Sequence, residues 1–164
     1  MRRRRDRGFE QFYRSTKDDL VRALIVAVRD RALAEDALSE AYARALRRWD
    51  DVAEHPYPSG WVMRTALNYA RSEGRIRART SSDDVPEVPV SDDPPTDPEL
   101  LRRILALPER QRDVVALRVV LDFDTSQTAQ VLGIAEGTVT THLFRTLSRL
   151  EQEVASVAPK EAWT

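Results

Sequence analysis

Cysteine is absent from this 164-residue sequence, and histidine and glycine are scarce, with two and five residues respectively. Without cysteine the chain forms no disulfide framework and no zinc–thiolate site. His55 and His142 are far apart with no metal-ligand set beside them, and no glycine-rich phosphate loop is present. The paired acids Asp92–Asp93 stand in a stretch that we expect to be disordered. The sequence therefore predicts no metal, no cofactor and no enzymatic activity.

Long apolar runs are also missing. The longest, from Ala23 to Val28, has six residues, far short of the roughly 20 that a membrane span requires. Arg2–Arg5 are not followed by an apolar segment, so we expect no signal peptide. With 41% apolar and 32% charged residues, the composition favours two small domains over one large core. We expect a cytoplasmic protein without membrane contact.

The net charge of −1 conceals a strong asymmetry along the chain. Residues 1–79 carry 18 Lys and Arg against 12 Asp and Glu, residues 80–99 carry seven acids and no base, and residues 100–164 carry eight of each. Residues 80–99 also hold five prolines and no aromatic residue, a composition that cannot bury enough apolar surface to fold. We therefore predict an all-α protein: a basic domain over 1–79, a flexible acidic linker over 80–99, a second domain over 100–157 and a tail over 158–164.

The C-terminal half has the pattern of a helix-turn-helix. Apolar residues recur at helical steps from Val114 to Val119, a short helix is expected from Ser126 to Leu132, and Gly133 precedes a longer helix starting at Glu136. One buried face is predicted for that last helix, formed by Val139, Leu143, Leu147, Leu150 and Val154. Its exposed N-terminal end would enter the major groove, which makes the candidate DNA contacts Thr138, Thr140, Thr141, His142 and Arg145. Arg145 suits a guanine or a phosphate equally well, and His142 suits a base contact or an ordinary surface hydrogen bond.

Three helices are predicted in the N-terminal half. The first runs from Phe9 to Val28 with a break near Ser15–Asp18, and the arginines before it form either a mobile terminus or an arm that contacts phosphates. The second spans Ala32 to Trp49 and has an apolar stripe formed by Ala34, Ala37, Leu38, Ala41, Tyr42, Ala45, Leu46 and Trp49. Pro56 and Pro58 predict a loop over Asp50–Ser59.

The third helix begins near Gly60–Trp61, and Gly74 is expected to fray its end. Its buried face is predicted to hold Val62, Ala66, Tyr69 and Ile76. The spacing of four, three and four places another set on a single basic face: Arg64, Asn68, Arg71 and Arg75. Such a face suits a phosphate backbone. Tyr57 or Trp61 would stack on an unpaired base, although a tryptophan at the start of a helix suits a core position as well.

These segments resemble a known family. The stretch LPERQRDVVALRVVLDFDTSQTAQVLGIAEGTVTTHLFRTLSRL resembles domain 4, the −35 element reader of extracytoplasmic-function (ECF) sigma factors of the sigma-70 family, through LPxRQR, A-x-x-L-G-I, E-G-T-V and L-x-R-x-L-x-R-L. AEDALSEAYARALRRW resembles the helix of sigma domain 2 that docks on the RNA polymerase clamp, and WVMRTALNYARSEGRIRAR resembles the segment that recognises and opens the −10 element.

The resemblance implies functions for the candidate residues. Polymerase contacts would be Asp36, Ser39, Glu40 and Arg44, with Ser39 in place of the usual Gln. The −10 element would be bound by Tyr57, Trp61, Arg64, Asn68, Arg71 and Arg75, and the −35 element by the helix-turn-helix set. The implied partners are core RNA polymerase (the β′ clamp and the β flap), promoter DNA and an anti-sigma factor.

Two other functions remain open. A helix-turn-helix activator would bind DNA without replacing sigma. A sigma-like interaction protein would keep the docking helix but lack promoter selectivity, which would agree with Thr140 and His142 standing where the family usually has Lys and Arg.

Overall fold

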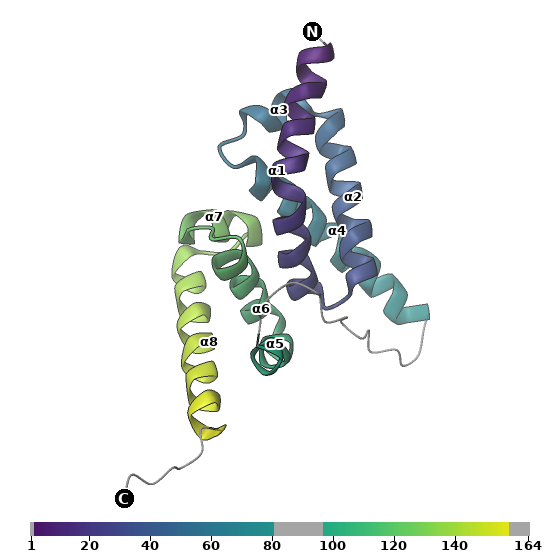
Figure 1. Cartoon of the computed structure of the whole chain (residues 1–164). Coiled ribbons are helices and arrows are strands. Elements are labelled where there is room, and N and C mark those ends of the chain that lie inside the picture. The colour runs from purple at the N-terminus through teal and green to yellow at the C-terminus, as the bar shows by residue number, and fades with distance from the viewer. Residues whose placement is uncertain (1, 81–96, 158–164) are drawn as a thin grey trace, which may run out of the picture.

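The computed structural model describes residues 2–80 and 97–157. Most of the predicted linker and the whole predicted tail lie outside these residues. The described residues form helices and connecting turns without a strand, in agreement with the predicted all-α fold. Three long N-terminal helices lie side by side, and the C-terminal helices pack against one end of them (Figure 1).

The first helix, α1, runs without interruption over Arg2–Val28. The predicted break near Ser15–Asp18 is wrong because the Ser15 and Thr16 hydroxyls donate to the Phe12 carbonyl, at 3.0 and 2.7 Å, within a continuous helix. The arginine-rich start is helical too. Arg5 donates to the carbonyls of Leu46 and Arg47, both at 2.9 Å, and so fixes the start of α1 to the end of the next helix.

Helix α2 spans Arg31–Arg47 and is capped by Asp30, whose Oδ1 accepts from Leu33 N at 3.0 Å. The predicted apolar stripe is buried apart from Leu46, which is exposed. A short helix, α3 (Trp49–Glu54), occupies the first half of the predicted loop. The loop prediction was too long because the two prolines act only beyond this helix, and Asp50 and Asp51 lie in its first turn, where carboxylates favour a helix.

Helix α4 covers Pro58–Thr80, with Pro58 in the first turn, where a missing N–H costs nothing. The predicted fraying at Gly74 is wrong, since α4 packs along α2 and continues past this residue. Val62 and Ala66 are fully buried as expected, whereas Ile76 is 51% exposed, contrary to the prediction. It lies in the last turns of α4, where the helix extends beyond its neighbours (Figure 1).

The C-terminal half begins with α5 (Pro98–Leu105), two residues before the predicted boundary, because Asp97 accepts from Glu99 N at 2.9 Å and caps it. It continues with α6 (Glu109–Val115), the single π-helical turn η1 (Ala116–Val120), α7 (Thr125–Leu132) and α8 (Glu136–Val157). Asp124 and Gln127 form a capping box at the start of α7. Gly133 ends α7 in a left-handed conformation at φ 65°. The predicted helix-turn-helix is confirmed.

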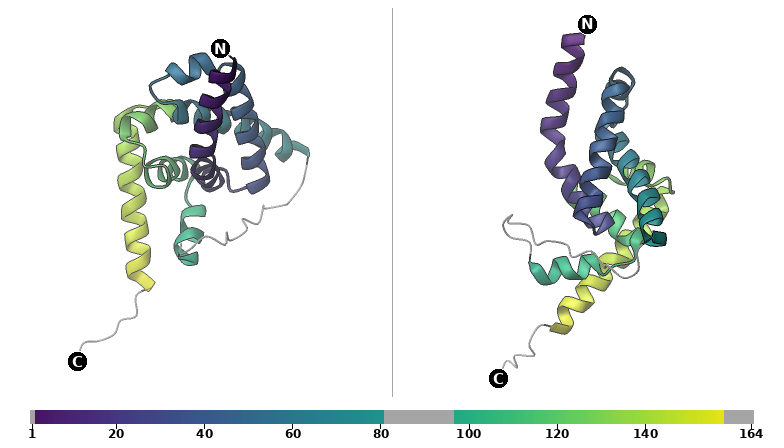
Figure 2. Two further views of the ribbon diagram at one scale, coloured as in Figure 1. Left: turned by 45° about the horizontal axis from the view of Figure 1, so that its top comes forward. Right: turned by 90° about the vertical axis from the view of Figure 1, so that its right-hand side faces the viewer.

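The single buried face predicted for α8 is wrong in part. Val139 is fully buried, but Leu147 and Val154 are 52% and 55% exposed, and Phe144 is 72% exposed. The C-terminal part of α8 extends away from the other helices (Figures 1 and 2). A regular apolar stripe is therefore buried only where α6 and α7 reach it.

The two halves of the chain pack on each other. Helices α6 and η1 contact α1, and α7 contacts α4 (Figure 2). Leu24 and Met63 of the N-terminal half and Val114 and Leu117 of the C-terminal half belong to one continuous buried cluster. This packing brings α4, the predicted −10 helix, against the C-terminal half.

Candidate nucleic-acid interface

The predicted docking residues lie on the outer face of α2. Asp36, Ser39 and Arg44 are exposed and Glu40 is half-buried. Arg44 Nε donates to Glu40 Oε1 at 2.8 Å, and Arg77 Nη2 donates to Asp36 Oδ2 at 3.2 Å. The face therefore presents paired charges that are open to a partner, and exposed pairs of this kind contribute little to stability.

A cluster of aromatic rings fixes α2 against α1. The buried Tyr42 ring meets Phe9, Phe12 and Tyr13 with centroids 4.9 to 6.3 Å apart. Its hydroxyl lies 2.7 Å from Thr16 Oγ1. Burial raises the pKa of Tyr42 to about 12. The docking face thus rests on a rigid, neutral core.

The predicted −10 residues of α4 differ in how accessible they are. Asn68 and Arg75 are exposed. Arg64 is exposed as well, but its Nη1 donates to the Gln130 carbonyl of α7 at 3.1 Å. The Arg71 side chain is only 26% exposed, and it pairs with Glu109, at 3.1 Å from Nε, and with Asp113 of α6. Helices α6 and α7 therefore engage two arginines of the predicted DNA-binding face.

Asp113 is the most deeply buried charge in this region. Its side chain is fully buried, and its Oδ1 has no hydrogen-bond partner among the described residues. Burial raises the pKa of Asp113, and the neighbouring Arg71 guanidinium opposes this only in part. Its other ionic neighbour, Arg110, is 3.7 Å away. The carboxylate therefore depends on Arg71 for compensation.

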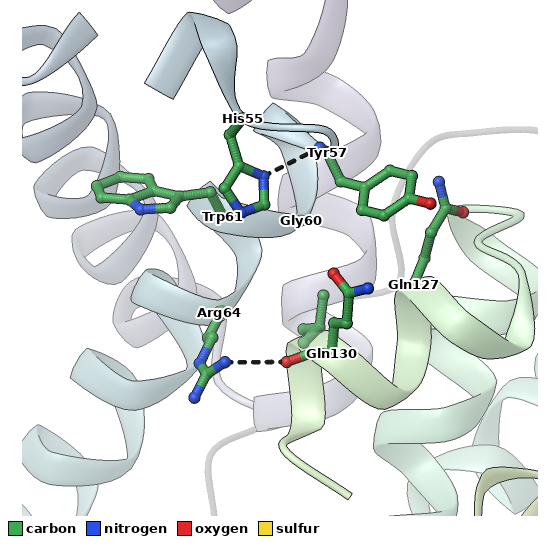
Figure 3. Close-up of a pocket in the computed structure, with 8 residues that line it drawn as sticks. His55, Tyr57, Gly60, Trp61, Arg64, Gln127 and Gln130 are labelled. Atoms are coloured by element: carbon green, nitrogen blue, oxygen red, sulfur yellow. Dashed lines mark hydrogen bonds between the residues drawn. The ribbon is translucent and has the colours of Figure 1, made fainter. Parts of the chain in front are cut away.

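Tyr57 and Trp61 lie at a cavity between the two halves. The cavity has a volume of about 270 Å³ and is lined from α4 and the preceding loop on one side and from α7 on the other. Figure 3 shows the Tyr57 ring directed toward Gln127, and Arg64 hydrogen-bonded to Gln130. Trp61 is half-buried: it packs against the core and also lines this cavity. The expected packing of Trp61 against the core is thus found, and stacking on an unpaired base stays a prediction.

The predicted −35 residues lie on the first turns of α8. Thr138, Thr140, Thr141 and Arg145 are exposed. The hydroxyls of Thr140 and Thr141 donate back to helix carbonyls, at 3.2 and 2.9 Å. His142 is half-buried, and its Nδ1 is buried without a partner among the described residues. The helix therefore presents small polar groups and one guanidinium to solvent.

Two arginines that had no predicted role join the halves of the chain. Arg112 is buried; its Nε donates to the Ala27 carbonyl at 3.3 Å, and its Nη1 donates to Leu107 O at 2.6 Å. Arg29 donates to the Leu105 carbonyl at 3.2 Å. Each guanidinium thus satisfies a carbonyl in the last turn of a helix of the other half. The LPERQR motif contains Arg112, but nothing in the sequence connects it to Ala27.

The described residues contain no group of three or more His, Cys, Asp or Glu side chains placed to hold a metal ion. Among them, none of the helices is long and apolar enough to span a membrane.

Comparisons with known proteins agree with these features. Residues 98–150 match the family described as Sigma-70, region 4. The chain is 33% identical over 153 residues to the RNA polymerase sigma-E factor of Streptomyces avermitilis, and this match covers 90% of this chain and 86% of that protein. It is 32% identical to the RNA polymerase sigma-E factor of Streptomyces coelicolor, with the same coverage of both chains. The fold is similar to that of the sigma factor RpoE of Bartonella quintana, solved in complex with the anti-sigma factor NepR, with a TM-score of 0.77, 21% identity and coverage of 92% of this chain and 98% of that one.

Proposed function

The chain belongs to the ECF group of the sigma-70 family of RNA polymerase sigma factors, and we propose that it binds core RNA polymerase and directs promoter recognition and transcription initiation. One observation carries this function: the similarity to the Streptomyces factors extends over 90% of the chain and includes both halves. A lone helix-turn-helix domain would match only the C-terminal half. The chain would supply specificity and no chemistry of its own, and it would act in the cytoplasm with the polymerase.

Polymerase docking is assigned to α2. Asp36, Ser39, Glu40 and Arg44 lie along one helix face whose opposite side is fixed in the core. A rigid helix that presents exposed charges is suited to binding another protein, because the helix loses little conformational entropy when it binds.

Promoter contacts are assigned to α4 and α8. Opening a duplex requires cations along one strand and a surface that replaces lost base stacking. Arg64, Asn68, Arg71 and Arg75 supply the polar and charged part of this surface, and Tyr57 and Trp61 supply the aromatic part. Thr138, Thr140, Thr141, His142 and Arg145 would read the −35 element in the major groove.

An anti-sigma factor is a further proposed partner. The Bartonella factor of the same fold is found in complex with such a protein. Regulation of this kind would act by covering polymerase and DNA faces.

Run-off transcription tests the function. Core RNA polymerase from the host bacterium is supplied with a pool of its genomic promoter fragments, with and without the protein. A sigma factor yields discrete transcripts only when the protein is present. DNA binding without polymerase binding would support the activator instead, and polymerase binding without transcripts would support the interaction protein.

Single substitutions test the residue assignments. Ser39→Arg should weaken core polymerase binding at least tenfold because a bulky cation then stands in the docking face, whereas Ala53→Arg, at an exposed position of α3, should not. Asn68→Ala combined with Arg75→Ala should preserve polymerase binding and reduce permanganate-detected promoter opening, and Arg14→Ala on α1 serves as its control. Equal opening by both proteins would remove Asn68 and Arg75 from the DNA interface.

A further inference from the structure

The arginines at the start of α1 belong to none of the sites assigned above. Arg5 has a structural role, since it donates to two backbone carbonyls at the end of α2. Arg3, Arg4 and Arg7 are exposed. Arg7 Nε donates to the Arg3 carbonyl at 3.2 Å, and among the described residues none of the three side chains forms an ion pair with a carboxylate. Their positive charge is therefore not compensated by this part of the chain.

These three arginines share one face of α1 and do not stabilise the helix. Arg7 follows Arg3 by four residues and Arg4 by three, which places their side chains next to one another. Like charges at this spacing repel each other. The first turn of α1 contains no acidic residue, and cations at this place also oppose the helix macrodipole. A partner that brings negative charge to this face would offset both unfavourable effects.

The arginine face is held in place by the packing of the residues beside it. A Cβ at Gly8 would lie 3.2 Å from Trp49 Nε1, so the backbone of α1 approaches this indole closely. The Phe9 ring meets the same indole edge to face, with centroids 5.4 Å apart. A charged face on an ordered helix loses little conformational entropy when it binds a partner.

The acidic residues 80–99 are attached at the other end of α1. They follow α4 and lead into α5, and Arg29 at the end of α1 donates to the Leu105 carbonyl of α5 at 3.2 Å. Helix α1 has 27 residues and is therefore about 40 Å long. Its arginine-rich start lies beside α3, away from α5 and α8 (Figures 1 and 2). The anion that suits this face therefore comes from another molecule.

We propose that Arg3, Arg4 and Arg7 bind the phosphate backbone of promoter DNA without reading its bases. Arginine presents a planar fork of donors that matches a phosphate group. The same face of the first two turns has no apolar side chain to form the centre of a protein–protein interface, whereas interfaces with DNA are polar and strongly basic. The inference goes beyond the contacts proposed for α4 and α8, and it rests on the proposed function only in identifying the DNA as a promoter.

The salt dependence of DNA binding tests this face. In one variant Arg3, Arg4 and Arg7 are all replaced by Gln, which has a similar helix propensity. Affinity is measured over a series of salt concentrations, for the holoenzyme with a promoter fragment and for the free full-length protein with a non-specific duplex. Each phosphate contact contributes about 0.9 to the slope of log K against log salt concentration. We expect the slope to become shallower by about 2.7, three times this contribution, in both measurements.

Two matched variants separate phosphate binding from other effects of charge. Replacement of the same three residues by Lys keeps the charge and should keep most of the slope. Replacement of Arg14, Arg22 and Arg102 by Gln removes the same charge at exposed positions outside the proposed sites, and it should leave the slope unchanged. The Gln variant of the arginine face should unfold at the same or a higher urea concentration than the wild type, because it removes cations from the start of a helix.

A tethered DNA-cleaving reagent shows where the face lies in the promoter complex. The chain has no cysteine, so Gln11→Cys introduces a single thiol at an exposed position one turn after Arg7. An iron chelate attached there should cut the promoter in the holoenzyme complex. Replacement of the three arginines by Gln in the same protein should reduce this cutting severalfold.

The results separate this inference from the proposed function. An unchanged slope together with normal run-off transcription would refute the arginine face while the sigma function stands. The face would also be refuted by weaker binding to core polymerase at an unchanged slope, which would indicate an acidic protein partner, or by a lower unfolding midpoint at an unchanged slope. If the wild type gives no transcripts, the sigma function fails, and the duplex measurement on the free protein still decides whether the face binds phosphates.

Discussion

Removal of Arg71 should destabilise the protein even though this side chain belongs to the proposed DNA face. In Arg71→Ala, Asp113 keeps a fully buried carboxylate whose nearest remaining cation, Arg110, is 3.7 Å away and 45% exposed. Breaking a buried ion pair costs about 3–5 kcal/mol. The Arg71 side chain is 26% exposed, so solvent partly screens its interaction with Asp113. We therefore expect the unfolding free energy to fall by an amount at the lower end of this range, about 3 kcal/mol.

A double-mutant cycle isolates this contribution. Asp113→Asn replaces the charge by a neutral amide of similar size, so Arg71→Ala combined with Asp113→Asn should unfold at a higher urea concentration than Arg71→Ala alone. The control is Arg75→Ala, one turn further along α4 and exposed, which should change the unfolding free energy by less than about 0.5 kcal/mol. Strict additivity of the two substitutions would show that the halves do not pair in solution.

The effect of pH provides a second check on the same variant. The folded-state pKa of Asp113 is raised above its ordinary value of 3.8 by burial, and loss of Arg71 removes a group that lowers it. The ionised form is therefore the unfavourable one in the folded protein. The destabilisation of Arg71→Ala should be largest at neutral pH, decrease as the pH falls through the raised pKa, and disappear below 3.8. Destabilisation that is independent of pH would contradict the role of the carboxylate.

Three further predictions concern stability and are checked by chemical or thermal unfolding. Tyr42 has a folded-state pKa of about 12 against 10 when unfolded. Its contribution to the free energy of unfolding is therefore fully present below pH 10 and is lost as the pH rises toward 12. Tyr42→Phe should abolish this alkaline loss of stability, and it should cost about 1 kcal/mol at neutral pH because the hydrogen bond with Thr16 is lost. Asp124→Ala should cost about 1 kcal/mol because it removes the capping box with Gln127; an unchanged midpoint would contradict the cap. Arg5→Ala should cost about 1 kcal/mol since it frees two carbonyls at the end of α2, and an effect only on DNA affinity would instead favour a phosphate-contacting arm.

Local signals were sufficient to predict most helices. Gly133 marks a helix end by chemistry that acts within a few residues, and it ends α7 where the sequence indicates. The spacing of Arg64, Asn68, Arg71 and Arg75 places them along one helix regardless of what surrounds it. Where the local signal was ambiguous, as with the prolines after Trp49 and the hydroxyls of Ser15 and Thr16, the predicted boundaries were wrong.

Burial was harder to predict. Leu147 and Val154 follow the same periodicity as Val139, yet only Val139 is buried, because α6 and α7 cover one part of α8 and not the rest. A helical pattern shows which residues share a face, but it does not show whether another helix covers that face.

The sequence by itself determined the family, the helices and the residues on the candidate faces, because these depend on local spacing and on motifs. Only the tertiary structure decided that α4 packs against α7 and that Arg71 of α4 pairs with carboxylates of α6. Arg71 and Asp113 are 42 residues apart in the chain, and Arg112 is 85 residues from the Ala27 carbonyl that it contacts. A single sequence carries no signal that connects residues so far apart. Their pairing follows from the way the two halves bury their apolar surfaces together, and that packing brings the proposed DNA-binding face against the chain's own carboxylates.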